Sequence, residues 1–85
     1  GAAAAYLRRG ERELVLWAPD DEPRRSLVTR EVARLLRAAA LGREPGHRGM
    51  LIGEINGSPA ADHAAARLFT QEGFVAGALW LQVRP

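Results

Sequence analysis

The sequence predicts a small α/β domain of the α+β kind, with a mostly antiparallel sheet and two helices in the order β-β-α-β-(β)-α-β. The run of strand-forming residues at 50–57 ends in Asn-Gly, which is typical of a tight two-residue turn because both central positions favour φ > 0. A helical pattern lies on each side of this run, and alternating patterns typical of strands lie near both ends of the chain. The length of 85 residues fits one domain, 1–85, with residues 1–5 as a flexible lead-in.

Composition limits the classes of protein that need to be considered. The chain has no cysteine, which excludes disulfides and thiolate metal sites and is compatible with a reducing, cytoplasmic location. No apolar run approaches the roughly 20 residues that span a bilayer, so we expect no membrane partner. All 12 basic residues are arginine, and the net charge is +2. A GC-rich genome explains this usage, and so does selection for planar, bidentate contacts to phosphate, so both explanations stay open.

Residues 6–17 are predicted to form a β-hairpin. Residues 6–8 enter, 9–11 form a three-residue turn with a glycine, and 13–17 return. On the return strand Leu14 and Leu16 share an apolar face that should meet the core. Trp17 is expected at the edge of the domain, half exposed.

A first helix is predicted from Pro23 or Arg24 to Ala40, because three acidic residues and a proline suit the positive end of a helix dipole. Gly42 should end it. Its expected buried residues are Val28, Val32, Leu35, Leu36 and Ala39.

The same helix carries a stripe of arginines, defined as Arg30, Arg34 and Arg37, which recur at i, i+4 and i+7. The stripe should lie away from the core. It is either an ordinary solvated helix face or a contact surface for a phosphate backbone.

The run 50–57 is predicted to be a central strand covered on both faces. Leu51 and Ile55 should point to one side and Ile52 to the other, and both sides are mostly apolar. After the Asn-Gly turn the chain is short and extended, and Pro59 limits any strand there to a sheet edge because proline donates no hydrogen bond.

A second helix is predicted over about 63–72, with Asp62 as its N-cap. Gly73 should adopt the left-handed conformation, which places Phe74 against Phe69 in the apolar contact of a Schellman motif. The other expected buried residues of this helix are Ala65 and Leu68, with Arg67 facing out. A closing strand over 79–84 should then place Leu79, Leu81 and Val83 on one side and Trp80, Gln82 and Arg84 on a partly solvated side.

No group of residues indicates catalysis, so we expect no enzymatic activity in this chain. The carboxylates at 20–22 suit helix capping, and Glu54 with Asp62 has no evident pocket or partner. His47 and His63 lack the spacing of a metal site, and the loop 42–49 lacks the Gly-Lys-Ser/Thr ending of a P-loop. Ser26 and Ser58 lie in no nucleophile elbow.

A nucleic-acid surface is the positive candidate, since phosphates pair with arginine and bases stack on exposed aromatic rings. The alternative for Trp17 and Trp80 is that they cover a core edge or a domain interface. The candidate nucleic-acid-binding residues are Arg8, Arg9, Arg12, Arg30, Arg34, Arg37, Trp80 and Arg84.

The chain resembles the extreme C-terminus of the Lhr family, the large helicase-related proteins of bacteria. The resemblance rests on Leu-Ile-Gly-Glu-Ile-Asn-Gly-Ser-Pro-Ala at 51–60, Glu-Gly-Phe at 72–74, the closing strand at 79–84 and the opening hairpin, with Tyr-Leu-Arg-Arg-Gly at 6–10 and Leu-Val-Leu-Trp at 14–17. Relatives are expected to have a Thr/Pro/Arg-containing turn after Gly-Phe, where this chain reads Val-Ala-Gly-Ala-Leu-Trp at 75–80. Contacts that relatives make at that turn therefore do not transfer.

The resemblance implies a C-terminal accessory module of a superfamily 2 ATP-dependent helicase that acts on DNA and RNA–DNA duplexes in DNA repair. The implied partners are the upstream domains of that helicase, and single-stranded DNA or an RNA–DNA hybrid. This chain has no Walker A or DEAD/DEAH-type box, so ATP and magnesium would belong to a motor elsewhere, and no cofactor is expected here. The alternative is a protein-interaction or homo-oligomerisation module that uses Trp17, Trp80 and a sheet edge.

Overall fold

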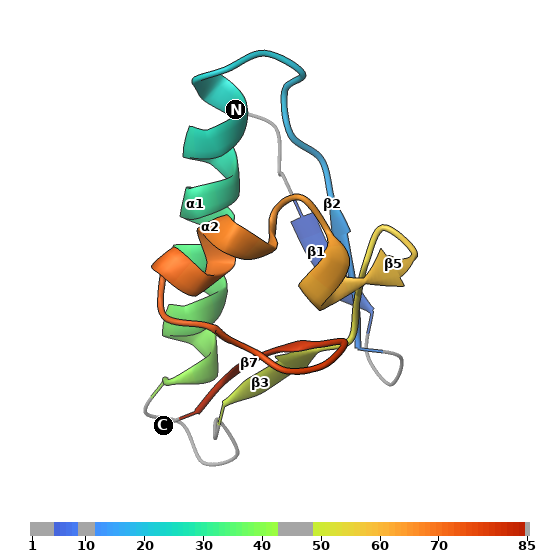
Figure 1. Ribbon diagram of the computed structural model, residues 1–85. Helices are drawn as coiled ribbons and strands as arrows, with labels where there is room; N and C mark the ends of the chain where they lie inside the picture. Colours follow the sequence, from blue (N-terminus) through green and yellow to red (C-terminus); the bar gives the residue numbers. More distant parts are fainter. Residues whose placement is uncertain (1–4, 9–11, 43–48, 85) are drawn as a thin grey trace.

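The computed structural model describes residues 5–8, 12–42 and 49–84 (Figure 1). Over these residues the protein is a small α+β fold with two α-helices, as predicted, but its strands form two sheets rather than one. All strand pairs except the parallel β2–β4 pair are antiparallel. In chain order the elements are β1 (Ala5–Arg8), β2 (Glu13–Leu16), α1 (Arg24–Ala40), β3 (Met50–Ile52), β4 (Glu54–Ile55), β5 (Ser58–Pro59), the 3₁₀ helix η1 (Ala60–Asp62), α2 (Ala66–Gln71), β6 (Val75–Ala76) and β7 (Leu81–Val83).

The predicted hairpin is confirmed. Strands β1 and β2 pair with Leu7 opposite Leu14 and Tyr6 opposite Val15. Leu14 and Leu16 are buried, as their shared apolar face predicted. Trp17 is 54% exposed at the end of β2, which confirms its expected edge position. The turn at 9–11 lies outside the described residues.

Helix α1 has the predicted bounds, but its buried face is rotated from the predicted one. Thr29, Val32, Ala33 and Ala40 are buried, whereas Leu35 is 54% exposed, so its expected burial is wrong. Ala39 is also exposed, contrary to prediction. The buried face of the helix includes the small Ala33, and Leu35, two residues further along, points to another side of the helix.

The run 50–57 does not form one central strand, because the strand is interrupted at Gly53. The carbonyl of Arg12 accepts hydrogen bonds from the amides of both Gly53 (2.9 Å) and Glu54 (3.3 Å). Strand β3 is therefore an edge of the sheet β3-β7-β6, while β4 lies inside the sheet β1-β2-β4-β5. Ile52 and Ile55 are both fully buried, although simple alternation places them on opposite sides.

The Asn-Gly turn and the edge strand after it are confirmed. Asn56 and Gly57 have φ angles of 52° and 85°, as a tight turn between β4 and β5 requires. Strand β5, which contains Pro59, lies at the edge of its sheet.

The second helix is shorter than predicted, and Asp62 does not cap it. The chain forms η1 first, and α2 begins only at Ala66, with no side-chain cap. The nearest substitute comes from His63, whose Nδ1 accepts a hydrogen bond from the amide of Ala65 at 3.0 Å.

The predicted Schellman motif at the end of α2 is confirmed. Gly73 has φ of 106°, and its amide donates to the carbonyl of Thr70 at 3.2 Å. The amide of Phe74 donates to the carbonyl of Phe69 at 3.1 Å, and the two rings meet edge to face with centroids 5.2 Å apart. The buried face of Ala65, Leu68 and Phe69 is also as predicted.

The closing strand is β7, which pairs with β3 and with β6, a short strand that the sequence did not predict. Leu81 and Val83 are buried as expected, but Leu79 is 55% exposed, contrary to prediction. A bend precedes the strand: Gly77 donates its amide hydrogen bond to the carbonyl of Trp80 at 2.8 Å. Leu79 lies within this bend and so leaves the alternation.

Helix α1 packs against α2, and the core lies between these helices and the two sheets (Figure 1). Neither helix of the described residues has the length and apolar composition needed to cross a bilayer.

Candidate nucleic-acid interface and a polar cavity

The hairpin carries an exposed aromatic pair. The rings of Tyr6 and Trp17 lie with centroids 5.6 Å apart and planes tilted by 41°. Tyr6 is 51% exposed, so about half of each side chain faces solvent. Tyr6 and Arg8 are two residues apart on β1 and share its outward face. An aromatic surface and a guanidinium therefore lie on the same side of this sheet.

Three predicted arginines belong to the hairpin. Arg8 forms an ion pair with Glu13 at 3.1 Å, and its side chain is still 53% exposed. Arg12 is exposed, and its side chain makes no hydrogen bond or ion pair with a residue that the structure describes. Arg9 lies outside the described residues.

The arginine stripe on α1 is exposed, but two of its side chains contact residues of α2 or of the segment after it. Arg30 donates a hydrogen bond to Oε1 of Gln71 at 2.8 Å. Arg37 lies over Gly73, where an added Cβ would come within 2.6 Å of its Nε. The stripe thus faces the C-terminal end of α2 rather than open solvent alone.

Arg34, the middle member of the stripe, is paired within α1. Its guanidinium donates two hydrogen bonds to Glu31, one of them from Nε at 3.1 Å. These bonds lower the pKa of Glu31 and raise the pKa of Arg34. Both groups are fully exposed, so the pair adds little to the stability of the fold.

Trp80 and Arg84 flank β7 of the second sheet, apart from the hairpin strands and the stripe. The indole of Trp80 lies over Gly77, where an added Cβ would come within 2.5 Å of the ring. Arg84 is exposed just after β7. The seven predicted residues that the structure describes therefore come from three different parts of the fold.

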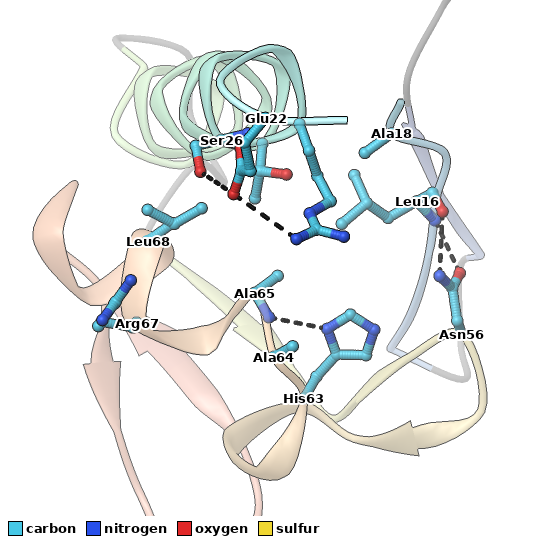
Figure 2. A pocket seen from close by; sticks show the side chains of 12 residues that line it. Leu16, Ala18, Glu22, Ser26, Asn56, His63, Ala64, Ala65, Arg67 and Leu68 are labelled. Carbon is cyan, nitrogen blue, oxygen red and sulfur yellow. Dashed lines mark hydrogen bonds and ion pairs between the residues drawn. The ribbon is translucent and has the colours of Figure 1, made fainter. Parts of the chain in front are cut away.

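The sequence did not predict a polar cavity of about 430 Å³ between the start of α1, the end of β2 and the start of α2 (Figure 2). Residues from four segments meet there, and no local pattern indicates such a meeting. The lining residues are Leu16, Ala18, Glu22, Arg25, Ser26, Thr29, Asn56, His63, Ala64, Ala65, Arg67 and Leu68.

On the α1 wall of the cavity, Glu22 acts as a helix cap. Its carboxylate accepts hydrogen bonds from the amide of Ser26 at 2.9 Å and from its hydroxyl at 2.8 Å. These bonds, with a smaller contribution from Arg25 at 3.6 Å, lower the pKa of Glu22. The predicted capping role of the acidic residues before this helix is confirmed for Glu22.

Asn56 joins the β4–β5 turn to the end of β2. Its Oδ1 accepts a hydrogen bond from the amide of Leu16 at 2.9 Å, and its Nδ2 donates to the carbonyl of Leu16 at 3.0 Å. Figure 2 shows this pair of bonds at one side of the cavity. The side-chain amide thus acts as a further backbone-like partner for β2, a role that the turn signal alone does not indicate.

His63 lines the cavity from the segment before α2 (Figure 2). Burial lowers the pKa of His63, so the neutral ring dominates at pH 7. Because Nδ1 accepts the Ala65 amide, the neutral ring carries its hydrogen on Nε2, which donates to no residue that the structure describes.

The described residues contain no group of three histidine, cysteine, aspartate or glutamate side chains that could hold a metal ion. His47 lies outside the described residues. The chain also stands apart in comparisons with known proteins: no family model, no curated protein and no solved structure matches it.

Proposed function

We propose that this chain is a non-catalytic accessory module of an Lhr-like helicase and contacts single-stranded nucleic acid through the outer face of its hairpin. The half-exposed Tyr6–Trp17 pair carries the proposal, because bases stack on such rings whatever their sequence. Arg12 supplies a cation for a phosphate nearby, whereas Arg8 would first have to give up its ion pair with Glu13. The helicase itself, its cytoplasmic location and its role in DNA repair rest on the sequence resemblance alone.

The hairpin is a better candidate than the arginine stripe. Arg30 is bonded to Gln71 and Arg34 to Glu31, so a phosphate would have to displace partners already in place. Arg12 makes no such bond among the described residues. The hairpin also has exposed aromatic rings, whereas the stripe does not include one.

The experiment titrates the chain into fluorescent single-stranded DNA and an RNA–DNA hybrid, both with 5′-hydroxyl ends, at two salt concentrations. We expect binding to single strands that weakens with salt, and Trp17→Ala to weaken it about tenfold through the lost stacking. Leu27→Ala, which removes an exposed apolar side chain from α1, is the matched control and should leave affinity unchanged.

The triple variant Arg30→Ala/Arg34→Ala/Arg37→Ala separates the two surfaces. We expect it to reduce binding less than Trp17→Ala does. If the triple variant abolishes binding and Trp17→Ala does not, the stripe is the interface instead. Absence of binding at low salt would overturn the nucleic-acid function altogether.

A second candidate function is protein interaction, either with upstream helicase domains or between copies of the chain. Val75, Leu79 and Trp80 are exposed on and beside β6, an edge strand of its sheet. Sedimentation velocity over a range of concentrations tests self-association. A dimer that dissociates in the Leu79→Glu variant would favour this function, whereas a monomer at all concentrations would exclude the homo-oligomer.

A further inference from the structure

The polar cavity is lined by Thr29, a nearly buried residue whose hydroxyl has no partner among the described residues. Thr29 is 2% exposed and is the buried polar residue of the described core. Its side chain makes no hydrogen bond with any residue that the structure describes. Every side-chain oxygen or nitrogen of those residues that lacks a hydrogen bond is accessible to solvent. The hydroxyl of Thr29 is therefore accessible too, and we infer that it faces the cavity that Thr29 lines. The hydroxyl therefore takes its hydrogen-bond partner from water or from a ligand in the cavity.

The charged side chains around this hydroxyl favour an anion. Arg25 and Arg67 line the cavity from α1 and α2, and Glu22 is the single carboxylate, so two positive charges and one negative charge give a net charge of +1. The oxygens of Glu22 are already bonded to Ser26. Arg67 makes no ion pair with a described residue, and the looser 3.6 Å contact of Arg25 with Glu22 leaves guanidinium donors available.

We propose that this cavity binds a phosphate group, which the guanidinium group of Arg25 and the hydroxyl of Thr29 hold inside it and the exposed Arg67 attracts from its edge. Arginine is suited to this role because its planar fork matches the phosphate oxygens and the bonds are charge-assisted. The Nε2–H of His63 provides a further, neutral donor on the same cavity.

The volume indicates a ligand larger than phosphate alone. A cavity of about 430 Å³ lies within the range of small-molecule sites, roughly 300–1,000 Å³. Leu16, Ala18 and Leu68 provide an apolar part of the wall. The ligand is therefore a phosphate monoester, either a free small molecule or the terminal phosphate of a nucleic-acid strand. This inference does not depend on the proposed hairpin surface.

The experiment follows the amide spectrum of the ¹⁵N-labelled chain during titration with inorganic phosphate and with a nucleoside monophosphate at constant ionic strength. We expect the amides of Thr29, Ala65 and Arg67 to shift and to saturate. A parallel titration compares one oligonucleotide with a 5′-phosphate and with a 5′-hydroxyl. Tighter binding of the phosphorylated strand alone would identify strand ends as the source, and monophosphate binding alone would identify a small molecule.

Three variants test the residues. Arg25→Gln should weaken phosphate binding about tenfold or more, as expected for a lost charge-assisted hydrogen bond, and Arg67→Gln should weaken it less, as expected for a charge at the edge of the cavity. Arg24→Gln removes the same charge from the neighbouring position, which does not line the cavity, and should leave affinity unchanged.

Thr29→Val separates binding from folding, because valine keeps the shape of the side chain and removes only the hydroxyl. We expect weaker phosphate binding with no loss of thermal stability, since no protein group loses a partner. Wild-type protein that shows no saturable shifts at the cavity, or equal binding in Arg24→Gln and Arg25→Gln, would overturn the proposal. The hairpin function would be untouched, because its test uses strands with 5′-hydroxyl ends.

Discussion

The two ends of helix α1 carry similar side chains in different surroundings. From its middle to its C-terminal end, Arg30 and Arg37 lie against α2, one bonded to Gln71 and the other over Gly73. Near its N-terminal end, Arg25 and Thr29 line a cavity instead. The comparison shows that an arginine pattern on a helix does not reveal which cations are available to a ligand, because the neighbouring element decides it.

The largest expected effect comes from breaking the side of the cavity that Asn56 holds together. Asn56→Gly removes both hydrogen bonds to the backbone of Leu16 without straining the positive φ of this position, and should cost about 2–3 kcal/mol of unfolding free energy, since two partly buried backbone groups lose their partner. Urea denaturation measures this. Ser58→Ala, an exposed change on the same β-hairpin, is the control. A loss no greater than in this control would show that water replaces the amide and that the link between β4 and β2 is weak.

A smaller effect tests the occupied end of α1. Gly73→Ala and Gly57→Ala each place a Cβ at positive φ, at a cost of roughly 1–2 kcal/mol. At Gly57 the new Cβ meets nothing within 4 Å, whereas at Gly73 it must also displace Arg37. We therefore expect a modest extra loss at Gly73, measured by the same denaturation experiment.

A double-mutant cycle shows whether Arg37 causes the extra loss at Gly73. In an Arg37→Ala background, Gly73→Ala should cost no more than Gly57→Ala does. If the difference persists without the arginine side chain, the packing of Arg37 over Gly73 is not its cause.

The smallest effect concerns pH at the cavity end. Burial lowers the pKa of His63 below its ordinary value of 6.5, so the unfolded chain binds the proton more readily than the folded chain. This contribution to stability is fully present above the unfolded pKa and is lost as pH falls below about 6.5 toward the lower folded pKa. We expect the melting temperature to decline over this interval, before the exposed carboxylates titrate.

The variant His63→Asn assigns this pH dependence. Asparagine keeps a side-chain acceptor for the Ala65 amide but does not titrate, so the decline below pH 6.5 should flatten. An unchanged profile in the variant would assign the decline to other groups.

The sequence by itself determined the features that depend on contacts between near neighbours in the chain. The bounds of α1, the β1–β2 hairpin, the turn at Asn56 and the Schellman motif at Gly73 and Phe74 all satisfy backbone groups within a few residues, so local residue types suffice to predict them. The cap at Asp62 failed because η1 intervenes, which is a competition between two local structures.

Tertiary structure decided the rest, because the deciding contacts join residues far apart in sequence. The hydrogen bonds to the carbonyl of Arg12 divide the run 50–57 at Gly53. Arg30 donates its hydrogen bond to Gln71, which lies 41 positions further along the chain. The cavity likewise exists only where β2, the start of α1, the β4–β5 turn and the start of α2 meet. A periodic pattern shows which side chains share a face of a helix or strand. Whether that face is buried, bonded or open to a ligand depends on the element that packs against it.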